Sequence, residues 1–176
     1  MDKNKILLVG YMGCGKSAVG NLLKSEIEYI FWDLDDYIEQ VEKQTIASIF
    51  DKKGEIYFRK IERKCLEVLI ANPKPMIIAL GGGTPCYFDT MKMITELNSV
   101  TTFYLKTSIN ELSRRLLPFK EKRPLIRHLQ TLDEIQEFIG KHLFERAPFY
   151  SQSDNIINTD GKTAQGVVDE IKAILT

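Results

Sequence analysis

Short runs of apolar residues recur along the chain and alternate with longer segments in which apolar residues follow a helical spacing. Runs of this length are typical of buried strands in a parallel sheet. The predicted strands are Ile6–Val9, Tyr29–Asp33, Met76–Leu80, Val100–Leu105 and Ile156–Ile157.

Helical spacing fills the intervals between these runs. A helix follows the first strand, and others are predicted over about 36–71 with a break near 52–54, between 83 and 100, and over 108–117, 132–149 and 164–175. Strands that alternate with helices indicate an α/β protein whose parallel sheet is covered on both faces. Such sheets bind ligands beyond the carboxyl ends of their strands. No repeat or linker interrupts the pattern, so we expect one domain over residues 1–176.

A glycine-rich segment, Gly10–Ser17, joins the first strand to the first helix and fits the phosphate-binding motif GxxxxGK[ST]. Strand, turn and helix start together direct backbone N–H groups at one point, where a polyphosphate is stabilised. Lys16 can reach the β- and γ-phosphates, and the Ser17 hydroxyl can bind Mg²⁺. The alternative is a turn that only closes the corner. The correct flanks favour a P-loop, so we predict binding of a nucleoside triphosphate.

Composition narrows the class of protein further. The 24 basic and 24 acidic residues balance, so no overall charge favours nucleic acid or a membrane as a partner. No apolar stretch reaches membrane-spanning length, and the first strand leaves no room for a signal peptide. The 3 cysteines are widely spaced and form no CxxC pair, which suits a reducing compartment. We therefore expect a cytoplasmic enzyme.

Carboxylates follow the second predicted strand, at Asp33, Asp35 and Asp36. In an extended chain Asp33 and Asp35 project to the same side. Neighbouring carboxylates repel each other unless a cation or substrate hydroxyls compensate. Beside a P-loop the natural cation is Mg²⁺, and the second carboxylate can accept the proton of an attacking hydroxyl. The alternative is structural, because Asp35 or Asp36 can cap the next helix.

Two further features are ambiguous by themselves. Gly81–Gly83 ends the third strand, which indicates a close approach to the backbone, a positive φ or a plain tight turn. Arg59 and Glu62 lie three positions apart on a predicted helix, which is usually a surface ion pair. Alternatively, Glu62 orients the guanidinium toward the carboxylate of a ligand.

In this order the motifs resemble those of the shikimate kinase family. The resemblance covers nearly the whole chain, and its markers are Gly10–Ser17, Asp33 with Asp35, the FRxxE of Phe58, Arg59 and Glu62, Gly81–Gly83, Arg123-Pro124-Leu125, and Arg146. Each marker is short, but the ordered set is specific. The resemblance implies ATP-dependent phosphorylation of the 3-hydroxyl of shikimate, a step in making aromatic amino acids through chorismate.

The resemblance also implies residue roles. ATP is expected to contact Gly13, Cys14, Gly15, Lys16, Ser17, Ala18, Arg115 and Arg123, with Arg115 against the adenine. Shikimate is expected to contact Asp35, Arg59, Gly81, Gly82, Gly83 and Arg146. Asp35 is the expected base, while Lys16 and Arg123 neutralise charge on the transferring phosphoryl group. Ser17 and Asp33 are the expected partners of Mg²⁺.

The family fold implies a three-layer α/β/α arrangement around a five-stranded parallel sheet in the order 2-3-1-4-5. A mobile lid is expected over residues 118–129 and a substrate-binding region over residues 35–61. The expected binding partners are ATP and shikimate, with no nucleic acid and no membrane, and we expect a monomer.

Other P-loop proteins remain as alternatives. Gluconate kinase shares the fold, but the FRxxE and GGG segments in this order count against it. A nucleoside-monophosphate kinase acts on a phosphate ester, whereas the aspartate pair suits a polyol. A GTPase-type switch needs DxxG after a strand and an NKxD segment, and Asp51–Gly54 follows a helical pattern while NKxD is absent. A non-catalytic ATP-binding scaffold is expected to lack a full set of substrate residues.

Two expectations come from single residues. Cys14 lies between the P-loop glycines and near Lys16, so we expect a reactive thiol that MgATP protects. Trp32 is the only tryptophan and adjoins the acidic pair, so we expect its emission to change when substrate binds.

Overall fold

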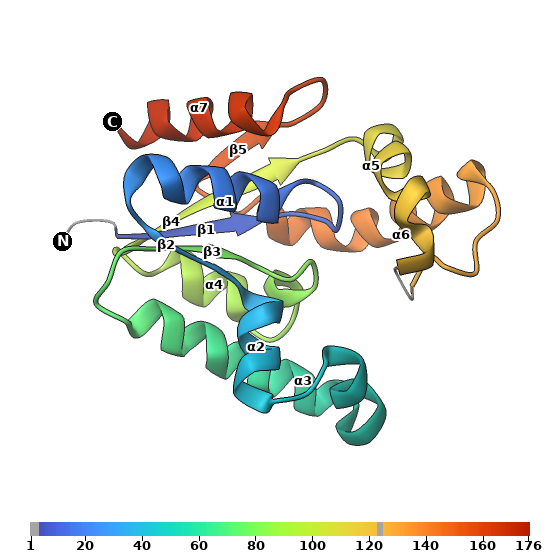
Figure 1. Ribbon diagram of the computed structural model, residues 1–176, viewed down its shortest axis with the longest axis horizontal. Coiled ribbons are helices and arrows are strands. Elements are labelled where there is room, and N and C mark those ends of the chain that lie inside the picture. Colours follow the sequence, from blue (N-terminus) through green and yellow to red (C-terminus); the bar gives the residue numbers. More distant parts are fainter. Residues whose placement is uncertain (1–3, 123–124) are drawn as a thin grey trace.

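The computed structural model describes residues 4–122 and 125–176 and contains a parallel five-stranded sheet (Figure 1). The strands are β1 (Lys5–Val9), β2 (Ile30–Asp33), β3 (Met76–Ala79), β4 (Val100–Lys106) and β5 (Asn155–Asn158). Their order is β2-β3-β1-β4-β5, and every pairing is parallel. The predicted fold class and strand order are therefore confirmed.

Helices cover both faces of this sheet. They are α1 (Lys16–Ile27), α2 (Leu34–Glu42), α3 (Ile46–Ala71), α4 (Thr90–Thr95), α5 (Ile109–Leu116), α6 (Leu132–Tyr150) and α7 (Ala164–Leu175), with the short 3₁₀ helices η1 (Thr84–Cys86) and η2 (Leu117–Lys122). Figure 1 shows α1 and α7 side by side on one face and α3 and α4 on the other. This is the predicted three-layer arrangement.

The buried strands explain why the apolar runs were a good guide. Every residue of β1 is buried, because β1 is central and both of its faces are covered. Even Lys5 is only 1% exposed, and its ammonium group donates hydrogen bonds to the Lys74 carbonyl and the Asn4 side chain, both at 2.9 Å. The core is thus continuous across the sheet.

The helical region predicted over 36–71 consists of two helices. α2 begins at Leu34 and ends at Glu42, and Thr45 then caps α3 by accepting a hydrogen bond from the Ser48 N–H at 3.2 Å. The break expected near 52–54 is confirmed at Gly54, whose φ of 77° lies in the left-handed region that favours glycine. The chain therefore turns twice before the long final part of α3.

The sheet order places β1 between β3 and β4, so the chain moves to one side after β1 and returns to the other side at β4. This switch point leaves a crevice beyond the carboxyl ends of the central strands. Over the described residues, the structure contains no helix that is both long enough and apolar enough to span a membrane.

Candidate active site

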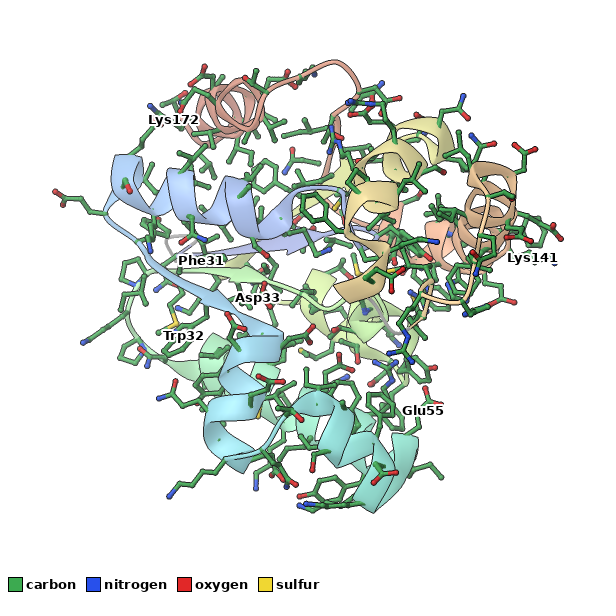
Figure 2. The ribbon with its side chains drawn as sticks, turned by 45° about the vertical axis from the view of Figure 1, so that its right-hand side comes forward. Phe31, Trp32, Asp33, Glu55, Lys141 and Lys172 are labelled. Carbon is green, nitrogen blue, oxygen red and sulfur yellow. The ribbon has the colours of Figure 1, made fainter. Side chains whose placement is uncertain are left out.

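A cleft of about 430 Å³ opens at the carboxyl ends of β1, β2 and β3. The predicted site residues that line it are Gly13, Gly15, Lys16, Ser17, Ala18, Asp33, Asp35, Gly81 and Gly82. Figure 2 shows Asp33 at the end of β2, between α1 and the start of α2. Tertiary structure therefore brings the P-loop, the acidic pair and the glycine run to one place.

The P-loop has the backbone geometry of a phosphate site. Gly13 and Gly15 have φ values of 83° and 104°, which L side chains rarely adopt. Gly15 is the N-cap of α1, and within the described chain no side chain caps that helix start. Lys16 curls back over the loop, and its ammonium group donates to the carbonyls of Gly10 at 2.8 Å and Tyr11 at 3.1 Å. The loop thus offers N–H groups and one cation to an anion.

Cys14 departs from the expectation of a reactive thiol. Its residue is only 2% exposed, and a Cβ added at Gly10 would lie 2.8 Å from its sulfur. The side chain therefore packs beneath the loop, and this burial counts against the expected reactivity. Burial of the side chain overrides the local signal from the helix start, while the backbone of Cys14 stays in the P-loop.

Asp33 contacts both the P-loop helix and α2. Its Oδ2 accepts a hydrogen bond from the Ser17 hydroxyl at 2.7 Å, and its Oδ1 accepts one from the Asp35 N–H at 3.2 Å. Asp33 is thus the N-cap of α2, and the alternative that Asp35 or Asp36 caps this helix is wrong. The extended geometry assumed for Asp35 is also wrong, because the helix has already begun at Leu34. Asp33 and Asp35 are instead linked by the hydrogen bond that caps α2, from the Asp35 N–H to the Asp33 carboxylate.

Asp35 is mostly buried at the bottom of the cleft. Burial, followed by the charges of Asp33 and Glu62, raises the pKa of the Asp35 carboxyl to about 6, while Lys16 opposes this rise. A carboxylate with a pKa near neutrality is a more effective proton acceptor than an ordinary aspartate. The environment of Asp35 therefore suits general base chemistry.

The Gly81–Gly83 segment leaves space for side chains from three other elements. A Cβ at Gly81 would lie 2.9 Å from the Thr84 hydroxyl and 3.2 Å from Asp35, and a Cβ at Gly83 would lie 2.9 Å from the Arg59 guanidinium. None of these glycines has a positive φ. Close approach, and not an unusual backbone conformation, is therefore the reason for glycine here.

Arg59 and Glu62 form a buried pair, so the interpretation as a surface ion pair is wrong. The Arg59 Nη1 donates to Glu62 Oε2 at 2.9 Å, and the two side chains are 12% and 3% exposed. The second oxygen of Glu62 accepts a hydrogen bond from the Thr84 hydroxyl at 2.6 Å. The ion pair is thereby fixed against the start of η1.

Arg146 reaches the same region from α6. Its guanidinium carbon lies 5.7 Å from the centre of the Tyr11 ring, and a Cβ at Gly82 would lie 3.6 Å from its Nη1. The Tyr150 hydroxyl, also on α6, donates to the Gly82 carbonyl. Two arginines far apart in the sequence therefore meet beside the glycine run.

Arg115 lies in a second hollow of about 340 Å³ on the other side of the P-loop. Its guanidinium donates to Glu111 at 2.7 Å and to the Cys14 carbonyl at 3.3 Å. The cleft and this second hollow share Gly13, Gly15 and Ala18 in their lining, so they lie on either side of the P-loop. The remaining predicted residue, Arg123, lies outside the described residues.

Trp32 does not line the cleft. Its ring packs edge-on against Tyr37, with 5.1 Å between the ring centres. Successive side chains of β2 point to opposite faces, so Trp32 points away from its neighbour Asp33 (Figure 2). The expected emission change stays a prediction, but direct contact with a ligand in the cleft is not its basis.

Sequence patterns did not show that Tyr11 connects the P-loop to α6. Its hydroxyl lies 2.9 Å from His142 Nδ1 on α6, and its carbonyl accepts a hydrogen bond from the Lys16 ammonium group.

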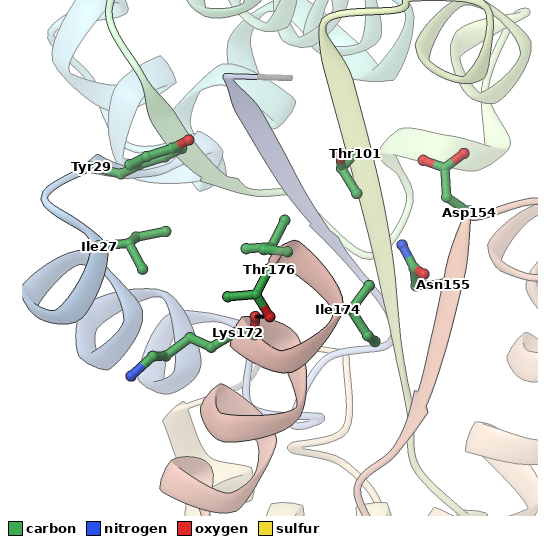
Figure 3. Close-up of a pocket in the computed structure, with 9 residues that line it drawn as sticks. Ile27, Tyr29, Thr101, Asp154, Asn155, Lys172, Ile174 and Thr176 are labelled. Carbon is green, nitrogen blue, oxygen red and sulfur yellow. Dashed lines mark hydrogen bonds between the residues drawn. The ribbon is translucent and has the colours of Figure 1, made fainter. Parts of the chain in front are cut away.

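A further hollow, of about 590 Å³, lies at the amino ends of the strands, between Tyr29, Thr101 and the end of α7 (Figure 3). None of the predicted site residues lines it.

Comparisons with known proteins agree with this geometry. The profile of the family described as Shikimate kinase matches residues 12–176. The chain is similar to the shikimate kinase of Flavobacterium johnsoniae, with 41% identity over 97% of this chain and 98% of the relative.

Solved structures show the same relationship. The crystal structure of shikimate kinase from Bacteroides thetaiotaomicron has a TM-score of 0.87 and 34% identity, over 97% of both chains. Shikimate kinase from Acinetobacter baumannii, in complex with shikimate, has a TM-score of 0.84 and 29% identity, over 98% of this chain and 92% of that one. A gluconokinase from Sinorhizobium meliloti, at 15% identity and a TM-score of 0.62, covers 98% of this chain and 91% of that chain and shares the fold alone. The chain therefore belongs to the shikimate kinase family.

Proposed function

We propose that this chain transfers the γ-phosphoryl group of ATP to the 3-hydroxyl of shikimate. The observation that carries the proposal is the single cleft in which a P-loop faces a buried aspartate of raised pKa. Phosphoryl transfer depends mainly on positioning and charge stabilisation, and the cleft provides groups for both.

The acceptor hydroxyl is activated by Asp35. In its ionised form, the Asp35 carboxylate accepts the proton as the hydroxyl oxygen attacks the γ-phosphorus. Lys16 exchanges its hydrogen bonds to the Gly10 and Tyr11 carbonyls for contacts with phosphate oxygens. Its positive charge then opposes the negative charge that develops on the transferring group.

The carboxylate of shikimate is held by Arg59 and Arg146, with the N–H groups of Gly82 and Gly83 as further donors. Arg59 is kept in place by Glu62, and Arg146 lies against Tyr11 at the other side of Gly82. Two guanidinium groups and backbone donors form a site for one planar anion.

Ser17 and Asp33 are the proposed partners of Mg²⁺. Their oxygen atoms lie 2.7 Å apart beside the P-loop, and hydroxyl and carboxylate oxygens are the ligands that Mg²⁺ prefers. The described residues include no cluster of three His, Cys, Asp or Glu side chains that could hold a metal, which fits an ion bound mostly by phosphate and water. Bound there, Mg²⁺ would supply positive charge against the phosphate oxygens.

The nucleotide base is proposed to bind beside Arg115, which lines the hollow on the far side of the P-loop. We further propose that residues 118–129 form a lid, with Arg123 contributing charge, and that residues 35–61 form the acceptor region of a single domain. We also propose that the protein is active as a monomer.

The test is ADP release with MgATP and shikimate, gluconate, AMP or no acceptor, together with Asp35→Asn and Arg59→Ala. Turnover with shikimate alone, nearly abolished in both variants, is the expected result. Turnover with gluconate or AMP instead would leave the assignment of the fold intact and would contradict the proposal that shikimate is the acceptor. Sedimentation at the assay concentration would test the monomer.

A further inference from the structure

The Arg59 guanidinium is in contact with protein on several sides. Glu62 accepts a hydrogen bond from Nη1 at 2.9 Å, and the Tyr87 ring covers one face, with 3.9 Å between the guanidinium carbon and the ring centre. Phe58 lies 5.1 Å from the same carbon. Stacking on an aromatic ring holds a guanidinium through its charge and its flat shape. Orientation of Arg59 is therefore fixed before any ligand binds.

Tyr87 holds a second carboxylate beside Arg59. Its hydroxyl donates to Glu55 Oε1 at 2.6 Å, and the same oxygen lies 3.5 Å from Arg59 Nε. Glu55 directly follows the break of α3 at Gly54, on the edge of α3 toward α6 (Figure 2). Tyr87 thus acts on Arg59 twice, through its ring and through Glu55.

Thr84 holds the other carboxylate. Its residue is 2% exposed, and its hydroxyl donates to Glu62 Oε1 at 2.6 Å, which leaves Oε2 for Arg59. A Cβ at Gly81 would lie 2.9 Å from the Thr84 oxygen, so this contact also needs the glycine before it. Thr84 and Tyr87 both follow Gly81–Gly83, and neither was found by sequence reasoning.

These contacts leave one edge of the guanidinium for a ligand. Nη1 donates to Glu62, whereas Nε, which lies 3.5 Å from Glu55 Oε1, and Nη2 make no hydrogen bond among residues 4–122 and 125–176. Only glycine at position 83 leaves room for the guanidinium in this orientation, because a Cβ there would lie 2.9 Å from Nη2, 3.0 Å from Nη1 and 3.2 Å from the guanidinium carbon.

We propose that Thr84 and Tyr87 are positioning residues that present the Nη2 edge of Arg59 to the single carboxylate of the acceptor. They set the affinity for the acceptor without touching it, and this role rests on the proposed function, which identifies that acceptor as shikimate. Without either contact the guanidinium can rotate, and the affinity for the acceptor falls because binding must then also order this side chain.

The experiment compares KM for shikimate with KM for ATP in variants of the two residues. Tyr87→Ala is expected to raise KM for shikimate roughly tenfold, whereas Tyr87→Phe, which keeps the ring, raises it about threefold. Thr84→Val keeps the shape but removes the hydroxyl, and raises it roughly fivefold, while Thr84→Ser restores the wild-type value. KM for ATP is expected to stay unchanged in all four.

Two controls separate positioning from general damage. Phe88→Ala changes an exposed aromatic side chain of the same loop, 63% exposed, and is expected to leave both KM values unchanged. In an Arg59→Ala background, where turnover is too low for a KM, Tyr87→Ala is expected to have no further effect on the Kd for shikimate measured by calorimetry, because Tyr87 acts through Arg59. With the uncharged methyl ester of shikimate as acceptor, Tyr87→Ala is expected to leave KM for the acceptor unchanged.

A parallel rise of both KM values, or an undiminished effect of Tyr87→Ala in the Arg59→Ala background, would overturn the positioning role. Wild-type KM values for shikimate in Tyr87→Ala and Thr84→Val would overturn it as well. If the wild-type protein does not turn over shikimate, the proposed function fails, and this inference with it. The wild-type control therefore distinguishes the two failures.

Discussion

The two halves of the proposed site are built in different ways. The proposed nucleotide side is a contiguous backbone segment, Gly10–Ser17, whose glycines adopt left-handed φ values and whose N–H groups start α1. The proposed acceptor side consists of side chains from α2, α3 and α6, with η1 and the following loop behind them. Sequence motifs identify a site made of one contiguous segment, but they miss supporting residues of a site made of side chains from distant segments.

The difference has a physical origin. A polyphosphate carries several charges, and a row of N–H groups at a helix start suits it whatever the side chains are. A small hydroxy acid offers one carboxylate and a few hydroxyls, so it must be distinguished by charged side chains at fixed distances. Buried support such as Glu62 and Thr84 is what fixes those distances.

The largest expected effect is on kcat, and it comes from the proposed base on the acceptor side. Asp35→Asn is expected to lower kcat by about 10³-fold, because amide nitrogen and oxygen cannot accept the hydroxyl proton. KM for ATP is expected to remain close to the wild-type value, since Asp35 belongs to the acceptor side. Steady-state ADP release checks both values, with Asp169→Asn, an exposed aspartate of α7, as the matched control. A kcat near that of the wild type would remove Asp35 from the role of base.

Paired glycine substitutions test the comparison directly. Gly13→Ala places a Cβ at a φ of 83° and 3.0 Å from Leu116, and is expected to raise KM for ATP roughly tenfold. Gly83→Ala displaces Arg59 and is expected to raise KM for shikimate about as much. Gly166→Ala on α7, where the Cβ would have 3.6 Å to its nearest atom, serves as control. If both site variants raise the same KM, the two halves are not independent.

A pH series sharpens the acceptor side further. Since the pKa of Asp35 is raised from 3.8 to about 6, the folded protein binds this proton more tightly than the unfolded chain, and stability falls as pH rises from about 4 to 6. At pH 7 the free energy of unfolding of Asp35→Asn should therefore exceed that of the wild type by about 3 kcal/mol.

Below pH 4 this stability difference should vanish, because the wild-type carboxyl is protonated in both states. Over the same range, kcat/KM of the wild type should decline as pH falls below about 6. Urea unfolding and initial rates measured at each pH provide the two curves. A stability difference that does not vary with pH would refute the raised pKa.

The smallest expected effect concerns Trp32. Because its ring packs on Tyr37 of α2 and does not line the cleft, shikimate is expected to change its emission only slightly, through movement of α2. Titration with shikimate, and separately with MgATP, checks this. Identical spectra at saturation of both substrates would show that α2 does not move.

Much of the fold was predictable from the sequence. The apolar runs identified all five strands, and most clearly the inner strands β1, β3 and β4, whose two faces are both covered, while the edge strands β2 and β5 are partly exposed. Helix starts were harder to place, since Asp33 ends a strand and caps a helix at once. The burial of Cys14, which counts against the reactive thiol expected there, was missed for a related reason, because only packing shows that its sulfur lies beneath the loop.

By itself, the sequence determined the P-loop and the candidate pairs at the strand ends, since these depend on residues adjacent in the chain and on local backbone preferences. Tertiary structure alone decided that Glu62 is buried, that Thr84 and Tyr87 hold the Arg59 pair, and that Arg146 arrives from α6. Those contacts join segments that are distant in sequence. Their energies come from burial and geometry, which no local pattern encodes.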